Sequence, residues 1–272
     1  MRVPFIKMHG LGNDFIVLDG RAQAIAPVDN ALAAALADRK TGIGCDQLIL
    51  LEPSTVADFR MRIFNADGGE VEACGNATRA IGLLHGVPAR IETLAGILTT
   101  TPAETGIAVD MGKPRFGWDE IPLAYAMDTL TMPVGWEDLE NPAAVNVGNP
   151  HVVFFVPDAH AIDLARLGPL IEHDPLFPAR INVNVATIAA RDAIRLRVWE
   201  RGVGETRACG TGACATAVAA MRRGLTGRRV TVMLTGGPLL IEWRDDGRIV
   251  MTGPAAESFR GSFDPAGYGV AQ

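Results

Sequence analysis

The alternation of hydrophobic and polar residues predicts a chain built mainly from short β-strands. Residues 59–64 and 194–199 alternate apolar side chains with arginines, as strands with one buried face do. Asp245-Asp246-Gly247, between two apolar segments, is a turn sequence typical of a β-hairpin. The predicted strands are residues 15–18, 48–51, 59–64, 152–156, 194–199, 239–243 and 249–252.

Fewer segments have a helical pattern. Residues 30–40 are rich in Ala and Leu, with Asn30 placed as the N-cap. Residues 162–172 should be interrupted at Gly168-Pro169, because proline lacks the backbone N–H that a helix interior needs.

Residues 76–85 and 211–221 form an unusual pair of segments, because small and apolar residues occupy nearly every position. A helix without a polar face is usually buried on all sides. Each segment follows a Cys-Gly dipeptide, whose cysteines are Cys74 and Cys209. This coincidence indicates an internal repeat.

The repeat relates the two halves of the chain at an offset close to the 135 residues between the two cysteines. The matches, which keep their order, are Gly12-Asn13 with Gly148-Asn149, Gln47 with Asn182, Arg62 with Arg197, Gly69-Glu70 with Gly204-Glu205, Ala73-Cys74-Gly75 with Ala208-Cys209-Gly210, and Val109 with Val250. Such collinear matches indicate duplication. We therefore predict two similar domains, residues 1–116 and 117–260, and a tail, residues 261–272, that could pack back on the N-terminal domain.

Composition and charge narrow the function classes. The 272 residues carry a net charge of −6 without a basic stripe, so we expect no nucleic-acid partner. The N-terminus lacks a signal-peptide pattern, and no apolar run approaches the roughly 18 residues of a membrane span. We therefore expect a cytoplasmic protein without a membrane partner. The four cysteines lack metal-site spacing, so no metal is predicted, and Cys45 and Cys214 are interpreted as small buried hydrophobic residues.

Cys74 and Cys209 are candidates for an acid and a base. Each precedes a predicted helix, whose free N–H groups and dipole should lower the thiol pKa and can hold a carboxylate. If two related domains face each other, the thiols flank one bound molecule, and a thiol with a thiolate can invert a stereocentre by proton transfer. The chain has only three lysines, Lys7, Lys40 and Lys113, and nothing resembles a pyridoxal-phosphate site, so we expect no cofactor.

Six motifs resemble those of the diaminopimelate epimerase family, and they run in order along nearly the whole chain. They are residues 7–15 (KMHGLGNDF), 42–47 (GIGCDQ), 64–68 (FNADG), 73–79 (ACGNATR), 148–151 (GNPH), and 200–202 (ERG) with 208–214 (ACGTGAC). Residues 117–142 match nothing in this pattern.

The resemblance implies an α+β fold of two pseudo-symmetric domains, each a mixed or antiparallel sheet or barrel around a central buried helix, usually in a homodimer. It implies interconversion of LL- and meso-2,6-diaminopimelate, in lysine and peptidoglycan precursor synthesis. Cys74 would be the proton donor and Cys209 the acceptor in the LL-to-meso direction.

The resemblance also implies a set of substrate-binding residues. They are Gly75, Asn76, Gly210 and Thr211 for the reacting carboxylate, Asn65, Asn149, Asn182 and Arg201 for the distal carboxylate, Glu200 for an ammonium group, and Asn13 and Gln47 along the pocket. His151 either supports this site or is an ordinary strand histidine.

Other functions are open at this point. Proline-racemase-like enzymes and phenazine-biosynthesis-type isomerases have a similar two-domain fold. The latter are expected to lack the cysteine pair. A thiol redox sensor or a non-catalytic amino-acid binder could use the cysteines as a reversible disulfide. Such a sensor would not need the set of asparagine, glutamine and arginine side chains.

Overall fold

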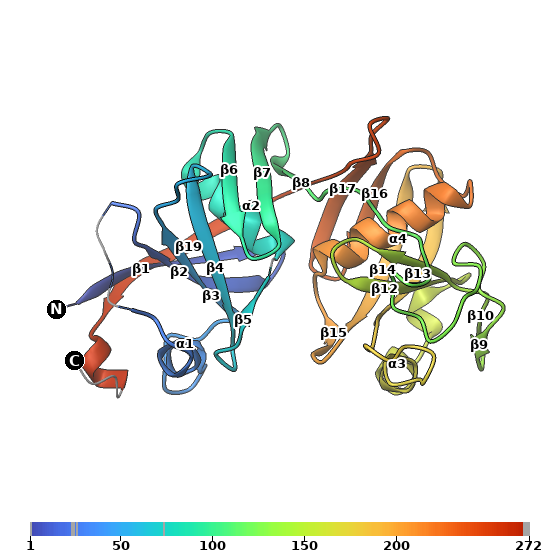
Figure 1. The fold of residues 1–272 in the computed structure, drawn as a ribbon, viewed down its shortest axis with the longest axis horizontal. Coiled ribbons are helices and arrows are strands. Elements are labelled where there is room, and N and C mark those ends of the chain that lie inside the picture. The colour runs from blue at the N-terminus through green and yellow to red at the C-terminus, as the bar shows by residue number, and fades with distance from the viewer. Residues whose placement is uncertain (1, 23–24, 26, 73, 269–272) are drawn as a thin grey trace. The chain divides into compact units, whose positions relative to one another are not determined.

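The computed structural model describes residues 2–22, 25, 27–72 and 74–268, and the chain divides into two units. Unit 1 comprises Met1–Val109 and Gly253–Gln272, and unit 2 comprises Asp110–Thr252. In each unit, strands surround a long buried helix, labelled α2 in unit 1 and α4 in unit 2 (Figure 1).

Unit 1 is organised around a mixed sheet. β1 (Val3–Gly10) pairs antiparallel with β2 (Asn13–Asp19), β2 parallel with β3 (Gln47–Glu52), and β3 antiparallel with β4 (Phe59–Asn65). β4 pairs antiparallel with β5 (Glu70–Val71) and parallel with β6 (Ala89–Thr93), which pairs antiparallel with β7 (Gly96–Ala103). The remaining elements are α1 (Asn30–Ala37), α2 (Gly75–His85), β8 (Gly106–Asp110), β19 (Ala256–Phe263) and the 3-10 helix η2 (Pro265–Tyr268).

Unit 2 repeats this pairing order. β11 (Ala143–Asn146) pairs antiparallel with β12 (Pro150–Phe155), β12 parallel with β13 (Asn182–Ala190), and β13 antiparallel with β14 (Ala193–Glu200). β14 pairs antiparallel with β15 (Gly204–Thr206) and parallel with β16 (Arg229–Leu234), which is followed by antiparallel β17 (Gly237–Trp243) and β18 (Ile249–Gly253). The remaining elements are β9 (Gly135–Trp136), β10 (Leu139–Glu140), the 3-10 helix η1 (Ala159–Ala161), α3 (Leu164–Glu172) and α4 (Gly210–Arg222). The predicted α+β fold of two similar domains is confirmed.

Both faces of the sheet in unit 1 are covered by helices. Phe15 and Val17 of β2 pack in the core beneath α2, whereas Ile16 and Leu18 pack in the core beneath α1. Successive side chains of a strand point to opposite faces, so a strand between two helices is apolar on both sides. Helix α2 also buries polar side chains, among them the charged side chain of Arg79, which is fully buried.

The first helix differs from its prediction at both ends. The N-cap of α1 is Asp29 rather than Asn30, because Asp29 Oδ1 accepts a hydrogen bond from the N–H of Leu32 at 2.8 Å. The helix ends at Ala37 instead of residue 40, since the chain then turns so that Asp38 accepts from two following N–H groups.

The predicted break at Gly168-Pro169 is wrong, because α3 continues through both residues. Leu164 and Ile171, on either side of the proline, are fully buried in the core of unit 2. A Cβ at Gly168 would lie 2.5 Å from the Trp199 ring, so the glycine allows close packing of helix on strand. Tertiary packing therefore outweighs the hydrogen bond that proline cannot make.

The boundaries of the units differ from the predicted bounds 1–116, 117–260 and 261–272. The chain passes into unit 2 at Asp110 and returns to unit 1 at Gly253, because β19 pairs with β1 along its length. Phe263 then packs in the core beneath α1, and Tyr268 packs against that core. The last four residues of the predicted tail, 269–272, lie outside the described residues.

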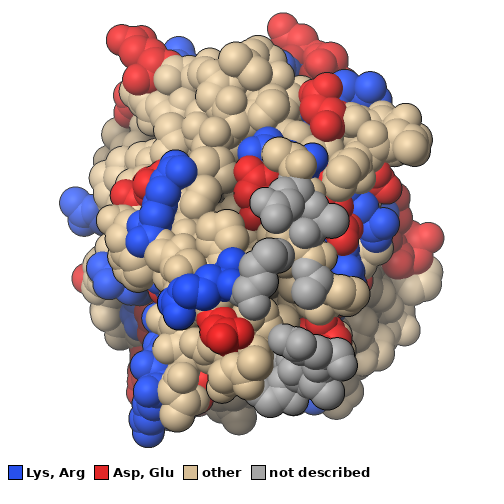
Figure 2. All heavy atoms as spheres, turned by 90° about the vertical axis from the view of Figure 1, so that its left-hand side faces the viewer, with Lys and Arg blue, Asp and Glu red and all other residues tan. Residues whose placement is uncertain are grey.

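Acidic and basic side chains are interspersed among uncharged residues on the face shown in Figure 2. Within the described part of the chain, no helix combines the length and the apolar character that crossing a membrane requires.

Candidate active site

Cys74 and Cys209 are the N-cap residues of α2 and α4, as the sequence predicted. Cys74 Sγ accepts a hydrogen bond from the N–H of Ala77 at 3.5 Å, and Cys209 Sγ accepts one from the N–H of Gly212 at 3.3 Å. Both sulfur atoms therefore lie against the first turn of a buried helix, where backbone N–H groups favour negative charge. Ala73, which belongs to the first cysteine motif, lies outside the described residues.

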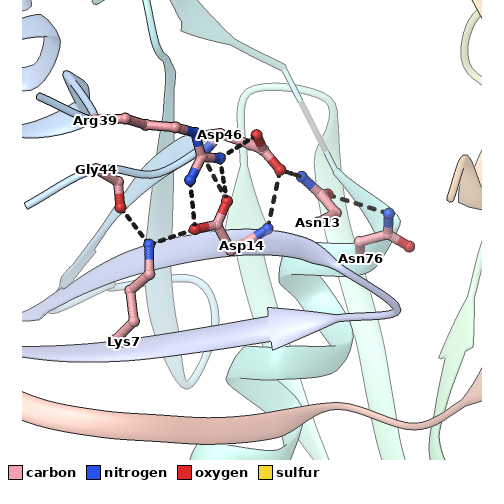
Figure 3. Close-up of polar contacts among 7 residues, drawn as sticks. All are labelled: Lys7, Asn13, Asp14, Arg39, Gly44, Asp46 and Asn76. Carbon is pink, nitrogen blue, oxygen red and sulfur yellow. Dashed lines mark hydrogen bonds and ion pairs between the residues drawn. The ribbon is translucent and has the colours of Figure 1, made fainter. Parts of the chain in front are cut away.

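In unit 1, the structure brings Cys74 together with two of the predicted asparagines. Asn13 Oδ1 lies 3.9 Å from Cys74 Sγ. The same oxygen accepts a hydrogen bond from Asn76 Nδ2 at 3.1 Å (Figure 3). Gly75 and Asn76 are both buried and form the start of α2. Their backbone N–H groups thus belong to the same helix terminus as the thiol.

Gln47 and Asn65 form a second pair of amides in unit 1. They lie opposite each other where β3 begins and β4 ends, and Gln47 Nε2 donates to Asn65 Oδ1 at 3.0 Å. Asn13 begins β2, the strand beside β3, so these three side chains belong to one end of three adjacent strands. Gln47 Oε1 is buried and, among the described residues, has no hydrogen-bond partner, so it is available to accept from a ligand.

In unit 2, Asn149 is held by a buried histidine. Asn184 Nδ2 donates to the carbonyl of Val152 at 3.1 Å and lies 3.0 Å from His151 Nδ1. A carbonyl can only accept, so the Asn184 nitrogen faces both groups and His151 Nδ1 is an acceptor. His151 Nε2 therefore carries the proton and donates to Asn149 Oδ1 at 2.9 Å. Burial lowers the pKa of His151 to about 3, so this histidine is neutral at physiological pH.

Both ends of the Asn182 side-chain amide form hydrogen bonds with backbone groups of unit 2. Its Nδ2 donates to the carbonyl of Pro150 at 2.8 Å, and its Oδ1 accepts from the backbone N–H of Arg201 at 2.9 Å. The Arg201 guanidinium donates to the carbonyl of Ala179 at 3.0 Å and is largely exposed. Asn182 thus positions the turn that carries Arg201.

Cys209 is 4% exposed, and its surroundings differ from those that the sequence suggested. Burial raises the pKa of its thiol well above the usual value, and the nearby carboxylate of Glu200 raises it further. Hydrogen bonds from Thr211, at 3.4 Å, and from the N–H of Gly212 lower the pKa but do not offset these effects. The predicted lowering of this pKa is therefore wrong for the free protein, because burial outweighs the helix terminus.

The other two cysteines lie in the cores. Cys45 packs beneath α1, and burial raises the pKa of its thiol to about 11. Cys214 is fully buried in α4. Both positions agree with the interpretation of these residues as small hydrophobic side chains.

Sequence reasoning missed several residues that contact the predicted site residues, among them Asp46 and Asn184. Asp46 contacts Asn13, and Asn184 contacts His151. A signal for Asn184 exists, because it follows Asn182 by two positions in β13 and so points to the same face of a buried strand. Asp46 lies inside one of the quoted motifs, but nothing in its spacing distinguishes it from a turn residue.

Comparison with solved structures defines the class of fold. A phenazine biosynthesis protein from Bacillus anthracis superposes with a TM-score of 0.69 at 16% identity, covering 97% of this chain and 99% of that chain. A probable proline racemase from Agrobacterium radiobacter superposes with a TM-score of 0.67 at 18% identity, covering 99% and 96%. At these identities the similarity concerns the fold alone, which is the two-domain fold shared by these proteins.

Comparison of sequences identifies the family. The family model described as diaminopimelate epimerase matches residues 5–117 and 143–257, and it leaves out most of the segment 117–142 that matched no motif. A diaminopimelate epimerase from Erythrobacter litoralis is 70% identical, covering 98% of this chain and 100% of the relative. One from Rhizorhabdus wittichii is 66% identical, covering 99% and 98%. The chain belongs to the diaminopimelate epimerase family.

Proposed function

We propose that this protein is a diaminopimelate epimerase that inverts one α-carbon without pyridoxal phosphate, with Cys74 and Cys209 on opposite faces of that carbon. The observation that carries the proposal is the pair of thiols that cap equivalent buried helices in two duplicated units. The names and the extent of similarity of the relatives support the choice of substrate. Among the described residues, no contact favours a proline-racemase-like reaction over this one.

The reaction needs a base to remove the α-proton and an acid to deliver a proton to the other face. In the LL-to-meso direction, Cys209 accepts the proton and Cys74 donates one, and the roles reverse in the opposite direction. The N–H groups of Gly75, Asn76, Gly210 and Thr211 bind the reacting carboxylate, on which charge accumulates as the proton leaves.

The distal end of diaminopimelate carries a second carboxylate and a second ammonium group. We assign the carboxylate to Arg201, whose guanidinium offers two parallel donors, together with Asn65, Asn149 and the positioning residue Asn182. Asn13 and Gln47 are further unit 1 side chains that we assign to the substrate. His151 supports the site by orienting Asn149.

Glu200 links substrate binding to the ionisation of Cys209. In the free protein burial raises the pKa of the Cys209 thiol and the Glu200 carboxylate raises it further, so that Cys209 rests protonated. A substrate ammonium group beside Glu200 would offset this negative charge, and the thiolate would then form more readily. The base would thus be more readily available when a substrate of the right charge is bound than in the free protein.

The proposal includes two further features that the family resemblance implies. One is a homodimer, and the other is a location in the cytoplasm, where a reducing environment would keep both catalytic thiols reduced.

Proton exchange with solvent tests the function most directly. The purified protein is incubated with LL-diaminopimelate in heavy water under reducing conditions without pyridoxal phosphate. NMR should show deuterium at the α-carbon together with formation of the meso isomer. No exchange would reject the epimerase function. Exchange with L-proline but not with diaminopimelate would favour the proline-racemase alternative.

A further inference from the structure

Asp46 lies at the centre of a group of charged residues beside Asn13, outside the set assigned to substrate. Its Oδ2 accepts hydrogen bonds from Asn13 Nδ2 and from the backbone N–H of Asp14, both at 3.0 Å. Its Oδ1 accepts from Arg39 Nη2 at 2.7 Å (Figure 3). Both oxygens of this carboxylate are thus engaged by donors.

The contact with Asp46 fixes which end of the Asn13 amide faces Cys74. An ionised carboxylate is only an acceptor, so the Asn13 group beside it must be the NH2 group. The oxygen of Asn13 then points away from Asp46, toward Asn76 Nδ2 and Cys74 Sγ. A thiol can donate to this oxygen, whereas a thiolate cannot, so the orientation favours the protonated form of Cys74.

A network of ion pairs holds Asp46 in place. Arg39 bridges Asp46 and Asp14, with Nη2 at 2.7 Å from the former and 2.6 Å from the latter. Lys7 donates to Asp14 and to the carbonyl of Gly44, which lies two residues before Asp46. The Lys7 and Asp14 side chains are only 10% and 18% exposed, so the inner part of the network is shielded from solvent.

We infer that Asp46 is a positioning residue that fixes the amide of Asn13 with its oxygen toward Cys74, so that Cys74 is held ready as the proton donor. The donor role of Cys74 rests on the proposed function, whereas the orientation of Asn13 does not. An asparagine at position 46 cannot replace the carboxylate. It has one acceptor oxygen, while Asn13 and Arg39 require acceptors on two different atoms.

A double-mutant cycle tests this inference. The full-length Asp46→Asn variant should have a kcat for epimerisation about tenfold lower, the effect of losing one well-placed hydrogen bond. Its Cys74 should react severalfold faster with iodoacetamide at neutral pH, measured on the isolated peptide by mass spectrometry. In an Asn13→Ala background, Asp46→Asn should change neither quantity further, because coupled residues are not additive.

Asp58→Asn is the matched control, because Asp58 also accepts from a backbone N–H, that of Arg90 at 2.7 Å, but has no contact with Asn13 in the structure described. It should leave both quantities unchanged.

Two results would overturn the inference. One is an Asp46→Asn protein with wild-type kcat and alkylation rate. The other is an effect of Asp46→Asn on kcat and on the alkylation rate that persists in full in the Asn13→Ala background. Loss of charge or of stability alone would produce such an effect without Asn13. The alkylation assay needs no substrate, so it decides the orientation of Asn13 even if wild-type protein shows no deuterium exchange.

If circular dichroism shows that Asp46→Asn is unfolded, Asp46→Glu replaces it as the test variant. It keeps the charge and both oxygens but displaces them by one methylene group. A smaller loss of kcat that vanishes in the Asn13→Ala background is expected. An undiminished kcat would contradict the inference.

Discussion

The two units orient equivalent asparagines in opposite ways. Asn13 of unit 1 gives its NH2 group to the carboxylate of Asp46, so its oxygen faces Cys74 and Asn76. Asn149 of unit 2 gives its oxygen to the Nε2–H of His151, so its NH2 group points away from the histidine. One unit therefore presents an acceptor and the other a donor at matching positions of the repeat.

The difference between the two asparagines follows from how far their hydrogen-bond partners are exposed to solvent. Asp46 and its partner Arg39 have side chains that are 43% and 57% exposed, so charges there keep part of their hydration. His151 and Asn184 are fully buried, and a neutral chain of hydrogen bonds avoids the cost of burying a charge. Duplication supplied two copies of one scaffold, and the polar partners of each copy adapted to its own burial. A zwitterionic substrate needs both a donor and an acceptor.

The two thiols extend the comparison. Cys74 is partly exposed beside an amide oxygen, whereas Cys209 is buried beside Glu200. If both are needed, Cys74→Ala and Cys209→Ala should each lower the rate of epimerisation by at least about 1,000-fold, the loss expected for an acid or base. The rate of meso-diaminopimelate formation measures this effect, with Cys214→Ala as the control. Substantial turnover by either variant would contradict the two-thiol mechanism.

Glu200 sharpens the contrast between the thiols. Its charge raises the pKa of the Cys209 thiol, so Glu200→Gln should lower that pKa, although burial still keeps it raised. Alkylation of Cys209 at neutral pH should become severalfold faster, while that of Cys74 stays the same. Peptide-resolved mass spectrometry gives both rates, and Glu205→Gln, which affects an ion pair with Arg197 on the neighbouring strand, is the control. An equal increase at both cysteines would show that Glu200 does not act locally.

The neutral state of His151 predicts a dependence of stability on pH. The unfolded chain binds a proton on this histidine near its ordinary pKa of 6.5, whereas the folded protein does so only at about 3. As pH falls from 6.5 toward 3, this group should lower the free energy of unfolding by about 1.4 kcal/mol per pH unit. Urea unfolding at several pH values measures the slope. His151→Phe, which places at this position the residue type of Phe15 in unit 1, should lack this contribution, and an unchanged slope would refute it.

The helix caps provide the smallest test. Asp29 and Asp163 cap α1 and α3, with carboxylate distances to the capped N–H of 2.8 Å and 3.3 Å. Asp29→Ala should lower the free energy of unfolding by about 1 kcal/mol, and Asp163→Ala by less, because its bond is longer and its side chain is 63% exposed. Asn30→Ala is the control and should have little effect. A larger loss from Asn30→Ala than from Asp29→Ala would restore Asn30 as the cap.

The sequence by itself determined the duplicated plan of this protein. Alternation in residues 59–64 and 194–199 predicted β4 and β14, and the apolar segments after Cys74 and Cys209 predicted the two buried helices. These patterns are local, because strand and helix periods are set by backbone geometry and by which face is buried. The motifs were sufficient to recognise the family, and the residues of the candidate site followed from them.

Tertiary structure alone decided the features that depend on distant neighbours. Helix α3 continues through Pro169 because its apolar residues are buried in the core of unit 2, and β19 joins unit 1 because β1 offers it a free edge. The pKa of Cys209 is raised because burial and Glu200 outweigh the helix terminus. The orientation of Asn13 likewise depends on Asp46, which only the fold brings into contact with it. The orientation of Asn149 depends on the protonation of His151, which the fold determines. Burial and hydrogen-bond partners are properties of the folded chain, so no local pattern contains them.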